Sequence, residues 1–261
     1  MAGASASLPL SPGRLRAVRL AVVFGLILAL EVACRAGAID RYTLLPPSEM
    51  VLGAWEILVR GEAWGDIAFT LRNVAASLVL ALVVGFLVGI GLHRLPRLRR
   101  AVNPLIASYY AVPVFIFYPL FIVVLGMNAL PLIAIGFLFA VVAVVVNTLN
   151  AFDRVPRVFF KTARVMGLNR AEEVRRVVLP AALPHLFTGL KLAVAYSFIG
   201  VIAGEFILAG AGLGYRIAFA YNNFQSARMY GLMVLLLVFV TAVNLTLHAW
   251  EHRIHERRGG R

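Results

Sequence analysis

The sequence predicts an all-α integral membrane protein with six transmembrane helices and with the N- and C-termini in the cytoplasm. Composition, the length of the apolar runs and the placement of the arginines support this fold class. Of the 261 residues, 61% are hydrophobic and 14% are charged, whereas a soluble domain has about 45–50% apolar and about 25% charged residues. A soluble core of this length could not bury so much apolar surface, so lipid is the predicted solvent.

Six apolar segments are long enough to cross the hydrocarbon core of a bilayer. A helix rises about 1.5 Å per residue, so about 20 residues cross a core of about 30 Å. Only helices and closed barrels cross lipid, and runs this long and continuous are helices rather than alternating barrel strands. The predicted spans are residues 17–38, 67–92, 104–126, 129–149, 186–208 and 229–249.

The basic residues indicate the orientation of these spans, because cytoplasmic loops carry an excess of lysine and arginine. With the N-terminus inside, 19 of the 25 basic residues fall on the cytoplasmic side. The segments that hold them are residues 1–19, 93–103, 150–191 and 250–261. We therefore predict a disordered cytoplasmic N-terminus over residues 1–16 and a single transmembrane domain over residues 17–261.

Several function classes are disfavoured. The net charge of +13 comes from short basic segments between apolar runs, without the aromatic interleaving of a nucleic-acid surface, so we expect no nucleic-acid partner. Cys34 is the only cysteine, which rules out an internal disulfide. We expect no catalytic, metal or cofactor site. The first 35 residues also fit a signal peptide. We interpret them as an uncleaved helix, because Glu31 stands where a lipoprotein signal ending at Cys34 needs a small or aliphatic residue.

Residues 150–185 form the longest basic segment, and their pattern predicts two short helices. Asp153 is the expected N-cap of the first helix, and Gly167 is the expected stop. Asn169 and Glu172 have the spacing of a reciprocal capping box for the second helix. Pro180 and Pro184 are expected to break that helix before the next span. We interpret the segment as a cytoplasmic docking loop, because an exposed apolar stripe there implies packing under the bundle or a partner.

The same segment resembles the cytoplasmic signature of the permease subunits of ABC importers. That signature reads Glu-Ala-Ala, three residues, Gly, nine residues, Ile, one residue, Leu-Pro. The corresponding residues here are Lys161, Thr162, Ala163, Gly167, Val177, Leu179 and Pro180. Residues 44–58, 104–127, 147–156, 179–193 and 201–215 also look like the nitrate/sulfonate/taurine-type permeases. The likeness covers about four-fifths of the chain, and Lys161 departs from the usual glutamate.

The resemblance implies a type I ABC importer permease in the bacterial inner membrane, which is not itself an enzyme. It implies that residues 150–185 are a coupling loop that docks on a separate ATPase subunit. The expected assembly has two permease copies, two ATPase subunits and a periplasmic or lipid-anchored binding protein. The expected cargo is a sulfonate, taurine, a nitrate-like anion or a thiamine-precursor pyrimidine, moved by alternating access.

Glu205 is the first candidate for the transport pathway, because a charge deep in a span must face the protein interior or a water-filled cavity. A buried structural acceptor is the alternative role. Further candidates are Tyr109, Tyr110, Pro113, Tyr118, Asn147, Tyr196 and Ser197. The pairs Gly85/Gly89 and Gly200/Gly204 permit close helix contact, within one chain or between two copies.

Two rival functions remain open. A secondary carrier driven by an ion gradient would show inverted repeats and several ionisable groups at the middle of the membrane. No clear repeat is visible, and only Glu205 lies deep in a span. A membrane-anchored scaffold without a transport role would leave both Glu205 and the docking loop unexplained.

Overall fold

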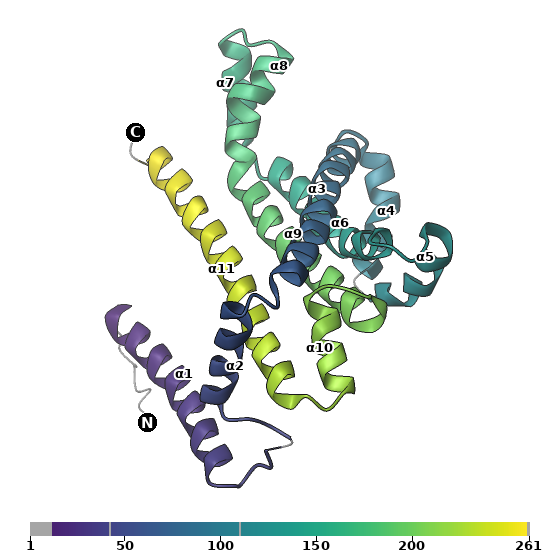
Figure 1. Cartoon of the computed structure of the whole chain (residues 1–261). Coiled ribbons are helices and arrows are strands. Elements are labelled where there is room, and N and C mark those ends of the chain that lie inside the picture. The colour runs from purple at the N-terminus through teal and green to yellow at the C-terminus, as the bar shows by residue number, and fades with distance from the viewer. Residues whose placement is uncertain (1–11, 42, 110, 260–261) are drawn as a thin grey trace, which may run out of the picture.

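The computed structural model describes residues 12–41, 43–109 and 111–259, and every regular element in this part of the chain is a helix (Figure 1). The elements are α1 (Pro12–Arg35), α2 (Pro47–Val59), α3 (Trp64–Arg94), α4 (Pro96–Tyr109), the 3-10 helix η1 (Val114–Phe117), α5 (Tyr118–Leu125), α6 (Leu130–Asp153), α7 (Arg157–Val165), α8 (Arg170–Glu173), the π-helical turn η2 (Val174–Val178), α9 (Leu179–Leu208), α10 (Leu213–Asn222) and α11 (Ser226–Gly259). The all-helical fold class predicted from the sequence is confirmed.

Among the described residues, five helices are long and apolar enough to cross a membrane, and a sixth span exists only as a broken pair. The prediction of one continuous span over residues 104–126 is wrong. The chain there forms α4 and then η1 with α5, bent by 92°. Pro113 has a non-helical backbone, with a φ of −73° and a ψ of 85°. It also lacks an N–H to donate and disfavours helix at the residue before it, so the helix cannot continue through this point.

Helices α3, α6 and α9 pack together as the core of the bundle. Glycines allow the close approach: a Cβ added at Gly85 would lie 2.7 Å from Val144, and one at Gly200 would lie 2.7 Å from the Cα of Gly136. A Cβ at Gly89 would likewise lie 2.6 Å from Thr148. The small-residue pairs noted in the sequence therefore serve contacts within the chain.

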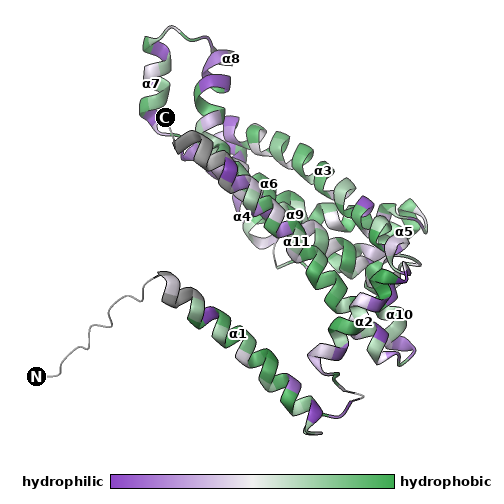
Figure 2. Cartoon of the chain, turned by 60° about the vertical axis from the view of Figure 1, so that its left-hand side comes forward, coloured by the Kyte–Doolittle hydropathy of each residue, from purple (hydrophilic) through white to green (hydrophobic). Residues whose placement is uncertain are grey.

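Helix α1 stands apart from this core (Figures 1 and 2). It is joined to α2 at its C-terminal end, where Ser48 donates from its backbone N–H and its hydroxyl to Glu31, at 3.0 and 2.7 Å. Of the predicted disordered N-terminus, residues 1–11 lie outside the described residues. Residues 12–16 are helical instead, because Pro12 suits the first position of a helix.

The segment that follows α6 leaves the bundle. Helices α7 and α8 project from one end of the molecule, beyond the end of α3 (Figure 1). From α8 the chain runs through η2 into α9 without a break, so one helical rod extends from Arg170 to Leu208. The predicted helix break at Pro180 and Pro184 is therefore wrong. Membrane helices tolerate proline where a local π turn satisfies the freed backbone groups, and η2 ends at Val178, two residues before Pro180.

Candidate functional site

The hinge of the α7–α8 hairpin is a left-handed turn at Gly167, whose φ is +66°. The N–H of Leu168 donates to the carbonyl of Ala163 at 3.1 Å, and the N–H of Gly167 donates to that of Arg164 at 3.0 Å. These two bonds form the Schellman motif, which ends helices where glycine follows. The sequence prediction that Gly167 stops the first helix is confirmed.

The second arm of the hairpin begins with the predicted capping box. Asn169 accepts a hydrogen bond from the N–H of Glu172 at 2.9 Å, and Glu172 accepts one from the N–H of Asn169 at 3.1 Å. Glu172 also lies 3.6 Å from Arg176. The first arm differs from the prediction. Asp153 ends α6 and forms a bidentate pair with Arg99, at 2.9 and 2.6 Å, so its carboxylate is occupied and caps no helix.

The residues that match the permease signature divide into a packed set and an open set. Ala163 is 1% exposed, and Val178 beside the signature packs with Ala151, Val155 and Ala182. Lys161 and Thr162 point outward, and the Thr162 hydroxyl donates to the carbonyl of Val158. Val177 is half-buried, and Leu179 is 36% exposed. Pro180 lies in the first turn of α9.

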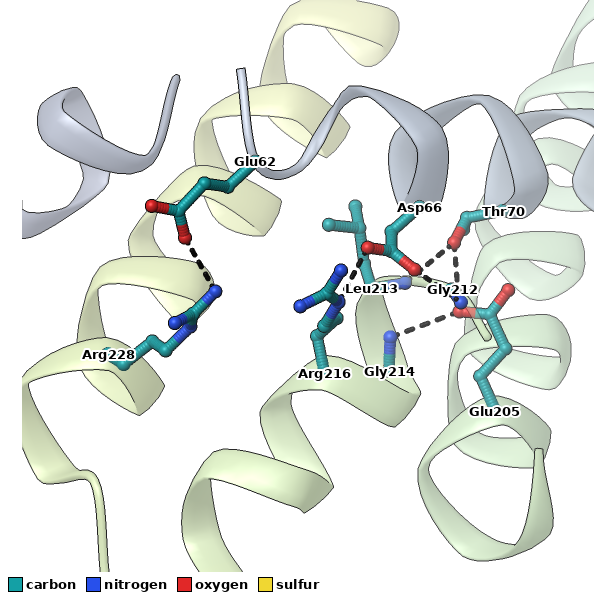
Figure 3. Close-up of polar contacts among 9 residues, drawn as sticks. All are labelled: Glu62, Asp66, Thr70, Glu205, Gly212, Leu213, Gly214, Arg216 and Arg228. Atoms are coloured by element: carbon teal, nitrogen blue, oxygen red, sulfur yellow. Dashed lines mark hydrogen bonds and ion pairs between the residues drawn. The ribbon is translucent and has the colours of Figure 1, made fainter. Parts of the chain in front are cut away.

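At the other end of α9, Glu205 belongs to a buried polar cluster, here called the clasp: Asp66, Thr70, Glu205 and residues 212–214 (Figure 3). Glu205 is fully buried, and its Oε2 accepts hydrogen bonds from the Thr70 hydroxyl at 2.9 Å and the Gly214 N–H at 3.0 Å. Oε2 of Glu205 thus accepts hydrogen bonds within the protein, whereas its Oε1 has no hydrogen-bond partner among the described residues. The pathway role considered from the sequence stays a prediction.

The clasp satisfies the first backbone donors of α10, which a helix leaves unpaired. The N–H of Gly212 donates to Asp66 at 3.0 Å, and the N–H of Leu213 donates to Thr70 at 3.0 Å. Asp66 also pairs with Arg216 at 2.7 Å. Helices α3, α9 and α10 are thereby tied together at one end of the bundle (Figure 3).

Both glycines of the clasp are required by the space available. Gly212 has a φ of +103°, and an added Cβ would overlap the Glu205 carboxylate. An added Cβ at Gly214 would overlap the carbonyl of Ile202. Residues 210–214 therefore form a sharp turn that packs closely against Glu205.

The remaining pathway candidates do not form one site. Tyr109 donates its hydroxyl to the carbonyl of Leu138 at 2.9 Å, and Tyr118 is 3% exposed in the same cluster of the α5–α6 region. Pro113 precedes η1. Tyr110 lies outside the described residues.

Three candidates lie on α6 and α9. Asn147 donates to the carbonyl of Ala143. Asn147 and Tyr118 line two different surface pockets. Tyr196 is half-buried against Ala81 and Ala140. Ser197 is fully buried, and its hydroxyl has no hydrogen-bond partner in the described chain.

Sequence reasoning missed most of the clasp, although α3 carries a readable signal. The polar residues Asp66, Thr70, Asn73 and Ser77 recur every three or four residues, which places them on one helix face. All four are buried. Polar residues repeating at this spacing inside an apolar span indicate a face turned toward protein, and this face meets Glu205.

Comparisons with known proteins agree with this architecture. Residues 81–259 match the family described as the binding-protein-dependent transport system inner membrane component. The chain is 32% identical over 203 residues to the bicarbonate transport system permease CmpB of Synechococcus elongatus, covering 75% of this chain and 70% of that protein. It is 27% identical over 213 residues to the nitrate import permease NrtB of Leptolyngbya laminosa, covering 78% and 75%.

A third relative is the putative aliphatic sulfonates permease SsuC of Bacillus subtilis, 26% identical over 223 residues and covering 83% and 81%. Among solved structures, the methionine ABC transporter MetNI in an inward-facing conformation matches with a TM-score of 0.63 at 23% identity, covering 76% of this chain and 96% of that chain. This structural likeness concerns the fold. The chain belongs to the family of binding-protein-dependent transport system inner membrane components, the multi-pass permeases of ABC importers.

Proposed function

We propose that the chain forms the membrane pathway of an ATP-driven importer and works by alternating access. Two copies form the pathway, two separate ATPase subunits bind at the α7–α8 hairpins, and a binding protein delivers the solute from outside. Membership of the permease family supports this assignment. The arginine distribution supports placing the hairpin in the cytoplasm, where ATP is available.

The observation that carries the proposal is the single rod from Arg170 to Leu208. At about 1.5 Å per residue this rod is about 58 Å long. A whole bilayer with its headgroups is thinner, at about 40–45 Å. One end of the rod is the second arm of the hairpin, and Glu205 of the clasp lies near the other. A movement of the hairpin is therefore passed directly to the helices that the clasp ties together.

We infer that the solute is a small anion of the nitrate, bicarbonate or sulfonate class. The three relatives are named for the transport of these anions. An uncharged heterocycle such as a thiamine-precursor pyrimidine is the second class, which the resemblance of the sequence also suggests. The choice between the classes belongs to the experiment below, since the described pathway candidates do not converge on one binding site.

The test is reconstitution of the permease into proteoliposomes with its ATPase subunit and candidate binding proteins. One loaded binding protein should stimulate ATP hydrolysis and drive uptake of its solute, while the same binding protein without solute should not. Uptake that follows an imposed ion gradient, with no requirement for ATP, would instead establish the secondary carrier. Omission of the ATPase subunit is the control, and it should abolish uptake.

A further inference from the structure

Helix α4, the first half of the broken span, has an inner face that packs on the bundle. Val102 and Ile106 lie on this face and pack against a buried apolar cluster of α3 and α6. Arg99 lies on the same face, because successive residues are about 100° apart around a helix. Its guanidinium pairs with Asp153 of α6 at 2.9 and 2.6 Å. The inner face therefore holds α4 to the bundle.

Three arginines lie on the opposite side, at the corner where α3 passes into α4. Arg97 is about 180° from Ile106 around α4, and Arg100 is about 60° from Arg97. Arg94 is in the last turn of α3, about 160° from the buried Leu92. All three are exposed, and a single residue separates the two helices. We call Arg94, Arg97 and Arg100 the arginine corner.

The described part of the chain gives the arginine corner no counter-charge. None of the ion pairs that the structure describes includes Arg94, Arg97 or Arg100. Helix α4 contains no acidic residue, and Asp153 at the end of α6 already pairs with Arg99. Like charges one turn apart repel one another. The corner is therefore complementary to an anion.

Exposed leucines accompany these charges. Leu95 between the two helices is 54% exposed, and Leu98 and Leu105 on α4 are 49% and 68% exposed. Leu98 and Leu105 are seven residues apart, so they lie on one stripe of the helix beside Arg97. Residues 101–109 carry no charge. The outer face of α4 thus begins with cationic groups and continues as an uncharged stripe, which is typical of a helix at the membrane interface.

The arginine corner lies at the membrane surface. The helix before it, Trp64–Arg94, is long and apolar enough to cross a membrane, and the broken pair after it begins at Pro96. The corner is at the end of the bundle from which the α7–α8 hairpin projects (Figure 1). The arginine distribution supports placing this end in the cytoplasm. Arginines at the ends of membrane helices reach the lipid headgroups, so the corner is at the level of the phosphates.

We propose that the arginine corner binds the phosphate of an anionic phospholipid in the cytoplasmic leaflet, and that an acyl chain of this lipid lies along Leu98 and Leu105. Guanidinium groups suit phosphate, because their N–H donors meet its oxygens in pairs. A soluble anion would leave both leucines uncovered, whereas a phospholipid covers them. The lipid then holds α4 from outside, as the Arg99–Asp153 pair holds it from inside. This inference goes beyond the proposed function, since lipid binding needs no ATPase subunit.

The experiment measures lipid binding to the full-length permease by native mass spectrometry, in neutral detergent with equal amounts of phosphatidylglycerol and phosphatidylcholine. The first lipid is anionic and the second is zwitterionic, so the ratio of the two on the protein reports the preference for charge. R94Q/R97Q/R100Q removes the charges of the corner, and R94K/R97K/R100K keeps them. R157Q/K161Q/R164Q is the matched control, because it removes three exposed charges from α7. Size-exclusion elution and thermal unfolding verify that each variant is folded.

The wild type should bind phosphatidylglycerol in preference to phosphatidylcholine. Each basic residue near an anionic surface strengthens binding about fivefold, so the glutamine variant of the corner should lose this preference by about tenfold or more. The lysine variant should keep most of the preference, and the α7 control should keep all of it. Millimolar glycerophosphate should not displace the lipid.

An unchanged preference in the glutamine variant of the corner overturns the inference. If that variant instead loses affinity for the ATPase subunit, the arginines belong to a protein interface. An equal loss in the α7 control also overturns it, because net charge alone would then attract the lipid. Displacement by glycerophosphate assigns the corner to a soluble anion. Each of these results leaves the proposed function standing, since uptake driven by ATP tests that function separately.

Discussion

The hairpin and the clasp, at opposite ends of the rod, both contain a glycine with positive φ, but they are built on different principles. At Gly167 an added Cβ would meet nothing within 4 Å, whereas at Gly212 it would overlap the Glu205 carboxylate. Hydrogen bonds between near neighbours in sequence shape the hairpin. The clasp instead joins residues up to 146 positions apart. The hairpin thus has open space around its glycine, whereas tertiary packing surrounds the glycine of the clasp.

The largest expected effect is at the clasp. Gly214→Ala places a methyl group against the carbonyl of Ile202 and the Cβ of Glu205, and overpacking a tight core costs about 3 kcal/mol. The measurement is thermal unfolding in detergent, monitored by tryptophan fluorescence. Gly210→Ala is the matched control, since its added Cβ meets nothing within 4 Å. Equal melting temperatures for the two variants would contradict the account of the clasp.

Glu205→Ala should rank next, with a loss of about 2 kcal/mol, because it leaves the Thr70 hydroxyl and the Gly214 N–H buried without an acceptor. Glu205→Gln keeps one oxygen for both donors and should stay within about 1 kcal/mol of the wild type. Both are compared by thermal unfolding and by uptake. A folded Glu205→Gln variant that fails to transport would show that the carboxylate acts in the pathway and not only as a structural acceptor.

Gly167→Ala should have a smaller and local effect. The left-handed conformation costs a residue with a Cβ about 1 kcal/mol, so the amide of Leu168, which bonds to Ala163, should exchange its hydrogen about fivefold faster. The melting temperature of the bundle should not change. If Gly167→Ala lowered the melting temperature as much as Gly214→Ala does, the proposed difference in packing between the hairpin and the clasp would be contradicted.

The smallest predicted effect is Glu172→Ala, which removes one half of the capping box and the ion pair with Arg176. A loss of about 0.5 kcal/mol is expected at the second arm of the hairpin, measured as faster hydrogen exchange at Asn169. Glu173→Ala is the control, because its carboxylate forms none of the ion pairs that the structure describes. Similar exchange in the two variants would argue against the capping box.

This contrast also explains which features the sequence could predict. Gly167, Asn169 and Glu172 were predicted correctly because helix stops and capping boxes depend on near neighbours. Asp153 was misplaced, because its carboxylate is taken by Arg99, 54 residues away. Asp153 pairs with Arg99 instead of capping α7.

The clasp could be predicted only in part. Glu205 stood out as a carboxylate in an apolar span, but its partner Thr70 lies 135 residues earlier, and no local rule joins the two. The broken span at Pro113 was missed for another reason. Apolar composition there fits a continuous membrane helix, and the fixed backbone of proline overrides it. The helical fold class followed from composition and run length alone.

The most direct test of the central claim measures ATP hydrolysis and solute uptake in the same proteoliposomes, for the wild type and for Gly167→Pro. Proline cannot adopt the positive φ of this hinge, so the variant should insert and fold but lose uptake driven by ATP. In the wild type, the loaded binding protein should stimulate hydrolysis and uptake together. Uptake by Gly167→Pro at the wild-type rate, with normal coupling to hydrolysis, would contradict the claim that this hairpin connects the ATPase to the pathway.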